Sequence, residues 1–434
     1  MIPDAPAAPI PPSTRRGFLG WRILAVGVLT SILTGPGQTI GVSVFIDPLV
    51  EALGVSRSTV SSAYLIGTLV GASAMPRFGR FVDRRGIRLS QMLVGVAFAV
   101  ALVNMSTVQN AVWLAVGFAG IRMMGQGALS MIPMVAVSLW FSRRRGVAMG
   151  VMATVGGAGI VAAPLILNAL IDATSWRVAW LIAAGFTLVT VVPLGRFGLV
   201  DRPSDVGQVP DGIENTGAGD DGGPDGAVGD NSSVLAAAPL RQSFTRAEAV
   251  RTRQFWILAT VSTVTGMLIT GLNFHQIDLL GEAGLNSTEA AAMFLPQILG
   301  SSTMAISVGF ILDRVGVRFV PAFGVVLLGL VHVLAAVMQP GLVVFVYAVA
   351  MGATGGAVRA ALSTMLPAYF GTDHIGSIQG VMTVTGVAGS AVGPVTLALA
   401  EAQLGSYRSA NLALLVLPML AFGFTLTNRR PVLA

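Results

Sequence analysis

Residues 79–88 read Gly79-Arg80-Phe81-Val82-Asp83-Arg84-Arg85-Gly86-Ile87-Arg88, and residues 309–318 read Gly309-Phe310-Ile311-Leu312-Asp313-Arg314-Val315-Gly316-Val317-Arg318. The two stretches share two glycines, an aspartate and two arginines at the same spacing, 230 residues apart, and each lies between long apolar runs. Glycine allows a sharp chain reversal, and an aspartate beside arginines can satisfy the exposed backbone groups of helix ends. The pattern predicts two tight loops in a duplicated chain.

The duplication continues beyond these loops. Gly150-Val151-Met152 recurs as Gly380-Val381-Met382, and the small residues and proline of 156–164 recur in 386–394 at the same offset. A period this long exceeds that of solenoid repeats and is typical of transporters built from two similar halves. The small-residue faces predict close helix packing.

Composition places the chain in a membrane. Of its 434 residues, 54% are hydrophobic and 11% are charged, and the mean hydropathy is +0.77. A soluble protein carries about 25% charged residues, so this chain could not cover a water-facing surface. The sequence contains no cysteine, and its three histidines lie far apart, so we expect neither a metal site nor a cofactor. The net charge is +6, and its arginines lie beside apolar runs. This placement favours binding to a membrane surface over binding to nucleic acid.

Apolar runs of about 20 residues predict transmembrane helices. Twelve such runs are present, at 21–47, 58–78, 89–107, 111–139, 147–171, 178–200, 254–279, 288–312, 318–338, 341–368, 376–401 and 407–427. The predicted fold is an all-α membrane protein with twelve transmembrane helices in two pseudo-symmetric six-helix halves.

The predicted organisation is a disordered tail at 1–17, a six-helix half at 18–200, a linker at 201–250, a second half at 251–428 and a short tail at 429–434. Arginines concentrate in one set of connecting loops, which predicts both termini on the cytoplasmic side of the inner (cytoplasmic) membrane. The Gly- and Asp-rich stretch 211–233 predicts disorder. Residues 241–253 fit either a short amphipathic helix or a solvated lead-in to the seventh span.

The paired Gly-x-x-x-Asp-Arg-x-Gly-x-Arg loops resemble the signature of the major facilitator superfamily. The resemblance covers nearly the whole chain outside the tail and linker. It implies a monomeric transporter that binds a small molecule between its halves near the bilayer midplane and works by alternating access. The loop residues Gly79, Asp83, Arg84, Gly86 and Arg88, with Gly309, Asp313, Arg314, Gly316 and Arg318, are predicted to act in conformational gating.

Finer features resemble the monocarboxylate and oxalate–formate antiporter-like branch. They are residues 54–58 after the first span, Trp140-Phe141 with Arg143 to Gly146 before the fifth, and residues 202–207 after the sixth. This branch commonly has a basic residue in the eighth span that meets the substrate carboxylate. Residues 288–312 contain none, so the chain departs from the branch at this position.

Two arginines lie inside predicted spans, Arg122 in the fourth and Arg359 in the tenth. A charge at bilayer depth is costly and indicates a functional role. Neither arginine has a carboxylate at comparable depth, which favours an anionic substrate held through the planar guanidinium. A structural role for Arg122, hydrogen-bonding backbone carbonyls of the first span, competes with substrate contact.

Polar residues of the first and seventh spans are further candidates for substrate binding. Gln38 follows the helix-breaking Gly35-Pro36-Gly37, and Asn273, His275 and Gln276 end the seventh span. For these last three, a role in an outer gate competes with binding. His275 either titrates during transport, as a site for a coupling proton, or is a satisfied structural group.

Together these residues predict a secondary transporter for a small, monocarboxylate-like organic anion, driven by an ion or substrate gradient. The alternatives are proton-coupled multidrug efflux, which usually needs an acidic residue facing the cavity, and a transporter-like sensor. The sequence has no phosphate-binding Gly-x-x-x-x-Gly-Lys motif and no nucleophile–base constellation, so we expect neither ATP-driven transport nor an enzyme.

Overall fold

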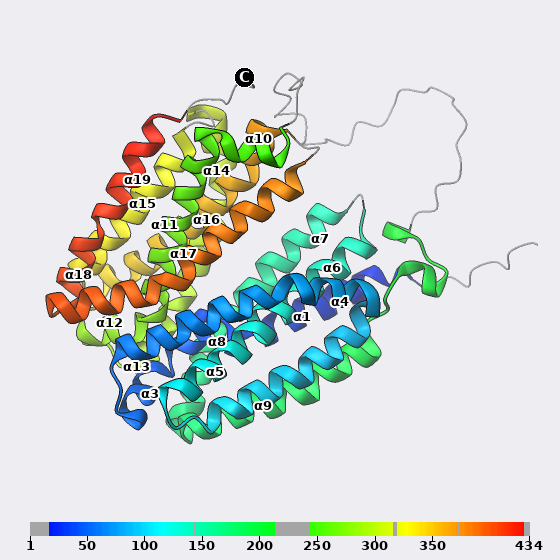
Figure 1. Ribbon diagram of the computed structural model, residues 1–434, viewed down its shortest axis with the longest axis horizontal. Coiled ribbons are helices and arrows are strands. Elements are labelled where there is room, and N and C mark those ends of the chain that lie inside the picture. Colours follow the sequence, from blue (N-terminus) through cyan, green and yellow to red (C-terminus); the bar gives the residue numbers. More distant parts are fainter. Residues whose placement is uncertain (1–16, 143, 213–243, 316–318, 372–373, 429–434) are drawn as a thin grey trace, which may run out of the picture.

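The computed structural model describes residues 17–142, 144–212, 244–315, 319–371 and 374–428, and their regular elements are all helical (Figure 1). The first half contains α1 (Gly20–Leu33), α2 (Thr39–Ser43), α3 (Ile46–Leu53), α4 (Arg57–Ser106), α5 (Ala111–Ile121), α6 (Ser130–Trp140), α7 (Arg145–Val151), α8 (Gly157–Ala173) and α9 (Trp176–Pro193). The second half contains α10 (Arg246–Arg251), α11 (Arg253–Phe274), α12 (Gln276–Glu282), α13 (Ser287–Ala292), α14 (Phe294–Val315), α15 (Val320–Ala336), α16 (Leu342–Phe370), α17 (Ile375–Leu404), α18 (Tyr407–Leu414) and α19 (Val416–Leu426).

Each predicted span corresponds to one helix, to a run of consecutive helices or, for the second and third spans, to part of one long helix. The first span is broken at the 3-10 turn Gly35–Gly37, where Pro36 lacks an amide hydrogen. In the fourth span, α5 and α6 are joined by the π-helical segment Arg122–Leu129. The second and third spans form the continuous α4, whose helical geometry is interrupted only at Gly86, with φ of 79°. The sequence predicted the fold class correctly.

Eight stretches of the described residues are long and apolar enough to cross a membrane, and two shorter apolar helices, α1 and Pro321–Ala336, accompany them. The exposed side chains of these stretches are largely apolar, as on α9, where Phe186 and Val189 face outward. The chain is therefore a multi-pass membrane protein. The first part of α4 and α14 fall in neither group, so for these two segments the crossing stays a prediction.

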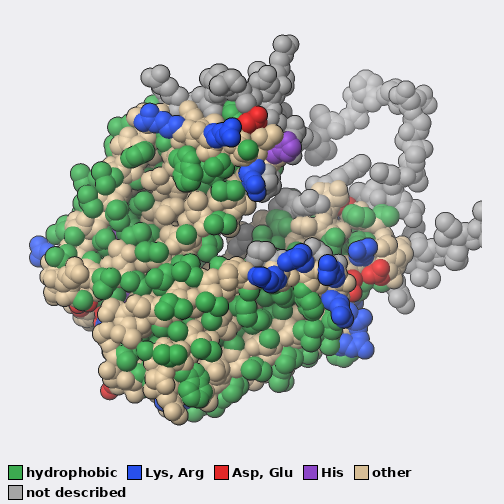
Figure 2. All heavy atoms as spheres, viewed as in Figure 1, with side chains coloured by type: hydrophobic (Ala, Val, Ile, Leu, Met, Phe, Trp, Pro, Cys, Tyr) green, Lys and Arg blue, Asp and Glu red, His purple; other side chains and the backbone are tan. Residues whose placement is uncertain are grey.

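The two halves lie side by side and meet at one end. Between the halves, α4 packs on α17, α8 packs on α13 and α14, and α2 packs on α11. We call the end that carries α3, α12 and α13 the closed face, and the end that carries α7 and α10 the open face (Figure 1). Figure 2 shows the molecule hollowed between the halves towards the open face, with basic side chains along the rim.

The predicted linker begins later in the structure than in the sequence analysis. Residues 200–212 pack on the first half, because the Trp140 indole donates to the Val200 carbonyl at 3.1 Å and the Leu19 amide donates to the Gln208 side chain at 3.0 Å. Asp211, at the start of the stretch predicted to be disordered, is buried and accepts a hydrogen bond from the Ser142 amide at 2.9 Å. The remainder, 213–243, lies outside the described residues, as do the predicted tails 1–16 and 429–434.

The lead-in to the seventh span contains a short helix, the first of the two predicted alternatives. In α10, Thr245 and Glu248 form a capping box, and the hydrogen bonds from Thr245 lower the pKa of Glu248. Ala249 and Phe244 pack in an apolar cluster with Phe370 of α16. These apolar contacts bury one face of the segment. The sequence analysis considered only its arginines and did not predict this burial.

Candidate functional site

Arg122 is buried, with 5% of its surface exposed, and its hydrogen bonds all stay within the first half. Its Nε donates to the Thr68 hydroxyl at 3.2 Å, and its Nη1 lies 3.3 Å from both the Gly37 carbonyl oxygen and the Thr39 hydroxyl. The guanidinium also lies over the ring of Tyr64, 4.7 Å from its centroid. The arrangement is that of a brace between α4, the fourth span and the broken first span.

Small residues bring this brace together. A Cβ on Gly37 would lie 2.8 Å from the Ile121 carbonyl oxygen and 3.0 Å from the Cα of Gly125, so only glycine fits where the first and fourth spans cross. The 3-10 turn that contains Gly37 leaves its carbonyl free of helical pairing, and Arg122 satisfies it. The break and the arginine are therefore parts of one local structure.

Arg359 is in a different environment. It is exposed, and its Nη2 donates to the Ser301 hydroxyl of α14 at 2.8 Å. On α16, the neighbouring Val358 belongs to an apolar cluster with Val325 of α15 and Val261 of α11, and Ala357 belongs to a second cluster that includes Leu327 of α15 and Met304 of α14. The contact with Ser301 directs the Arg359 side chain towards α14.

Arg359 has no carboxylate partner among the described residues, in which both ion pairs belong to Arg57. The hydrogen bond to Ser301 occupies one of its five N–H groups. The remaining N–H groups can donate to a ligand that carries a carboxylate.

Gln38 is half-buried on the first half. Its side-chain amide donates to the Thr34 hydroxyl at 2.9 Å and lies 3.4 Å from the Ser130 hydroxyl of α6. These contacts hold the side chain at the break of the first span, where it offers a carbonyl oxygen to a ligand.

The three candidates at the end of the seventh span differ from one another. Gln276 is fully buried; it donates to the Ala290 carbonyl at 3.2 Å and accepts from the Gln297 side chain at 2.8 Å, so it connects α12 to α13 and α14 inside the second half. Asn273 is half-buried, and its Oδ1 has no hydrogen-bond partner among the described residues. His275 contacts both halves, as described next.

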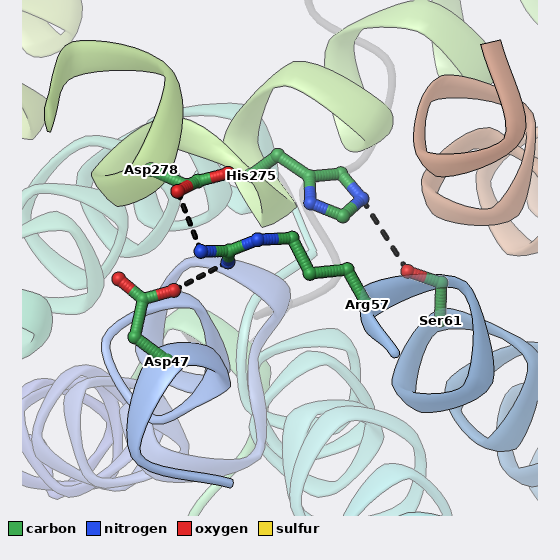
Figure 3. A network of polar contacts seen from close by, with 5 residues as sticks. All are labelled: Asp47, Arg57, Ser61, His275 and Asp278. Carbon is green, nitrogen blue, oxygen red and sulfur yellow. Dashed lines mark hydrogen bonds and ion pairs between the residues drawn. The ribbon is translucent and has the colours of Figure 1, made fainter. Parts of the chain in front are cut away.

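The closed face carries polar contacts between the halves (Figure 3). Arg57, at the start of α4, forms an ion pair with Asp47 of α3 and another, at 2.6 Å, with Asp278 of α12. His275 Nε2 lies 3.0 Å from the Pro394 carbonyl oxygen and 3.3 Å from the Ser61 hydroxyl of α4. Arg57 belongs to the stretch 54–58 that follows the first predicted span, and no motif in the sequence pairs it with either aspartate.

A second contact between the halves lies nearby. The Asn168 amide of α8 donates to the hydroxyls of Ser287 and Thr288 at 3.3 and 3.1 Å, and to the Asp172 carboxylate at 2.8 Å. The Thr288 hydroxyl in turn donates to the Asp172 carboxylate at 3.3 Å. The closed face is therefore fastened at two places, by the ion pair of Arg57 with Asp278 and by these hydrogen bonds between α8 and α13.

The loop predicted to act in gating is described only in part. Gly86 has a positive φ, and a Cβ at this position would overlap the Asp201 carboxylate, so glycine is needed there. Asp201 accepts from the Arg88 amide at 2.9 Å, and Arg88 donates from Nε and Nη2 to the Arg196 carbonyl at 3.0 and 2.7 Å. Partial burial raises the pKa of the Asp201 carboxyl. The helix end is capped by Asp201, which the sequence analysis did not single out.

The structure shows few contacts for the other residues predicted to act in gating. Arg84 is exposed and Gly79 is half-buried with open space around its Cα. Gly316 and Arg318 lie outside the described residues, and so do the side-chain environments of Asp83, Gly309, Asp313 and Arg314. The gating role of these residues stays a prediction.

The sequence profile described as Major Facilitator Superfamily matches residues 26–394. The chain belongs to this superfamily. Among solved structures, it is similar to a bacterial homolog of the human lysosomal transporter Spinster in an inward-facing, unoccupied conformation, with a TM-score of 0.72 at 16% identity over 94% of this chain and 96% of the other. The nucleoside transporter NupG gives a TM-score of 0.71 at 12% identity over 95% and 100%. These two likenesses concern the fold.

Sequence relatives carry several activities. The oxalate:formate antiporter of Oxalobacter formigenes is 30% identical over 36% of this chain and 37% of its own length. Monocarboxylate transporter 13 of Rattus norvegicus is 26% identical over 86% and 81%, and the methyl viologen resistance protein SmvA of Salmonella typhimurium is 25% identical over 71% and 67%. An uncharacterized transporter of Mycobacterium tuberculosis is matched over 60% of its length, so this chain covers less than two thirds of that transporter and of the oxalate:formate antiporter. The family resemblance inferred from the loops is confirmed.

Proposed function

We propose that this protein is a secondary transporter that moves a small organic anion across the membrane by alternating access between its halves, driven by an ion or substrate gradient. The observation that carries the proposal is Arg359, an exposed guanidinium within the tenth span that has no carboxylate partner among the described residues. A charge kept inside a membrane span costs roughly 2.5–3.5 kcal/mol on insertion scales. Binding of an anionic ligand offsets this cost and gives a functional reason for the charge.

Ser301 completes the proposed anion site. Because its hydroxyl oxygen accepts from Arg359, the hydroxyl hydrogen is left to donate to a second acceptor. A carboxylate placed beside both groups accepts from the guanidinium with one oxygen and from Ser301 with the other. Ser301 lies in the eighth span, so the pair offers a basic group near the span in which the monocarboxylate-like branch commonly has one.

The first half contributes neutral groups to the proposed site. Gln38, held by Thr34 and Ser130, orients the uncharged part of the substrate. Arg122 is a brace in this proposal, since it is buried and held by Gly37, Thr39 and Thr68 of the same half. The same proposal places the open face in the cytoplasm, with both termini, in a monomer of the inner membrane.

Similarity to the methyl viologen resistance protein supports a second candidate, proton-coupled efflux of a cationic compound. A cation would need a carboxylate in the interior between the halves. Among the described residues, Asp47, Asp278, Glu282 and Glu401 belong to elements that end at the closed face. This placement favours the anion.

A thermal-shift screen tests the proposal. Purified protein is heated with small monocarboxylates and oxalate, with their neutral amides, with glucose and with methyl viologen. We expect at least one carboxylate to raise the unfolding temperature and its amide to leave that temperature unchanged. Stabilisation by methyl viologen alone would replace the proposal with efflux, and stabilisation by glucose alone would assign a neutral substrate.

A further inference from the structure

The ion pairs of the closed face are arranged so that one arginine joins the halves. Arg57 belongs to the first half and lies between Asp47 of the same half and Asp278 of the other (Figure 3). Because Asp47 already holds the guanidinium in place, the contact at 2.6 Å to Asp278 is the one that separation of the halves must break. The chain thus has a clamp at this face.

His275 lies beside this clamp with its side chain at the junction of the halves. A carbonyl oxygen can only accept, so the 3.0 Å contact to Pro394 places a hydrogen on Nε2. Nδ1 is buried and has no hydrogen-bond partner among the described residues. The imidazole is therefore neutral in this conformation, because a hydrogen on Nδ1 would be buried without an acceptor.

The charged and titratable groups around the ring oppose a second proton. From α4, Arg57 brings a positive charge, and Ser61 brings a neutral hydroxyl. From α18, the Tyr407 ring lies 6.0 Å from the imidazole. The carboxylates of Asp47 and Asp278 are engaged by Arg57, and Glu401 of α17 acts on Asp278. None of these groups offers an acceptor to Nδ1.

We propose that His275 is a proton-sensitive latch of the closed face, so that the halves close there only when the imidazole is neutral. Separation at this face withdraws Ser61 and exposes the ring to water, where Nδ1 can take a proton. Reclosure then requires that the proton leave, since an imidazolium would be buried beside Arg57. The inference rests on the proposed function in that the halves separate at this face during alternating access.

The direction and size of the effect follow from linkage. A proton that binds only the separated form stabilises that form. If the ring titrates near the ordinary histidine value once exposed, lowering the pH from about 8 to about 5.5 multiplies the ratio of separated to closed molecules by about ten. Acid on this side of the membrane therefore holds the closed face open.

Distance measurement by double electron–electron resonance tests the latch. The chain has no cysteine, so Glu51→Cys on α3 and Gln403→Cys on α17 give two exposed label sites on opposite halves at the closed face. The measurement is made without any anion, at about pH 8 and about pH 5.5. We expect one short distance at the higher pH and a second, longer distance whose share relative to the short one grows about tenfold at the lower pH.

Two variants separate the latch from the clamp. His275→Gln keeps a donor for the Pro394 carbonyl but cannot take a proton, so its distances should not respond to pH. Asp278→Asn weakens the contact to Arg57, so the longer distance should already be present at the higher pH and should still grow with acid. Unchanged wild-type distances, or a His275→Gln response equal to that of the wild type, would overturn the proposal. Either result leaves anion binding at Arg359 untouched, since no anion is present.

Discussion

Arg122 and Arg359 lie in the fourth and tenth spans, which correspond in the duplicated chain, yet their surroundings differ. Arg122 is buried and braced by Gly37, Thr39 and Thr68. Arg359 is exposed and hydrogen-bonded to Ser301. The comparison teaches that a charge within an apolar span indicates a function only once its burial and its hydrogen bonds have been accounted for, because a buried guanidinium held by three protein groups is not accessible to a ligand.

The largest difference should appear in stability. Arg122→Met removes the hydrogen-bond donor of the Gly37 carbonyl and of the Thr68 hydroxyl in a buried site, which we expect to lower the free energy of unfolding by about 3 kcal/mol. Arg359→Met, the matched control, removes an exposed side chain and should change the unfolding temperature by less than about 2 °C. Thermal unfolding of both purified variants is the measurement. Equal losses of stability would erase the distinction between the two arginines.

A smaller effect is expected at the partner of Arg359. Ser301→Ala removes one hydrogen bond from the proposed anion site and should weaken carboxylate binding about fivefold. Ser363→Ala is the control, since Ser363 is exposed one turn further along α16 and donates only to the Ala360 carbonyl. Calorimetric titration with the most stabilising carboxylate measures both. Equal carboxylate affinities of the two variants would show that Ser301 is not part of the anion site.

The smallest effect should come from the ring above Arg122. Tyr64→Phe keeps the aromatic face over the guanidinium but loses the 2.7 Å hydrogen bond to Thr39, so we expect a loss of about 1 kcal/mol. The unfolding temperature should fall less than in Arg122→Met under identical conditions. A loss as large as that of Arg122→Met would mean that the hydroxyl, and not the guanidinium, holds the first span.

The fold was largely predictable from sequence, and the site was predictable only in part. Apolar run length and the 230-residue offset are properties of the chain itself, so the spans and halves followed from them. The roles of Arg122 and Arg359 depend on which backbone groups approach them. Only the crossing of Gly37 over the fourth span shows that Arg122 is satisfied.

Contacts between distant segments could not be predicted from the sequence for the same reason. Arg57 and Asp278 are brought together from opposite halves, and the sequence contains nothing that pairs them. In the first loop, the cap of the helix that follows Gly86 comes from Asp201, more than a hundred residues away. Local motifs identified the loop, whereas its partners depend on tertiary packing.

The charge preference of Arg359→Gln tests the central claim most directly. The measurement is the affinity of wild type and variant for the most stabilising carboxylate and for its neutral amide, in matched preparations with equal unfolding temperatures. Loss of a charge-assisted hydrogen bond should weaken carboxylate binding about thirtyfold and leave amide binding nearly unchanged. Carboxylate affinity that stays the same or improves in Arg359→Gln would contradict the anion-transporter account and make efflux of cationic compounds the leading interpretation.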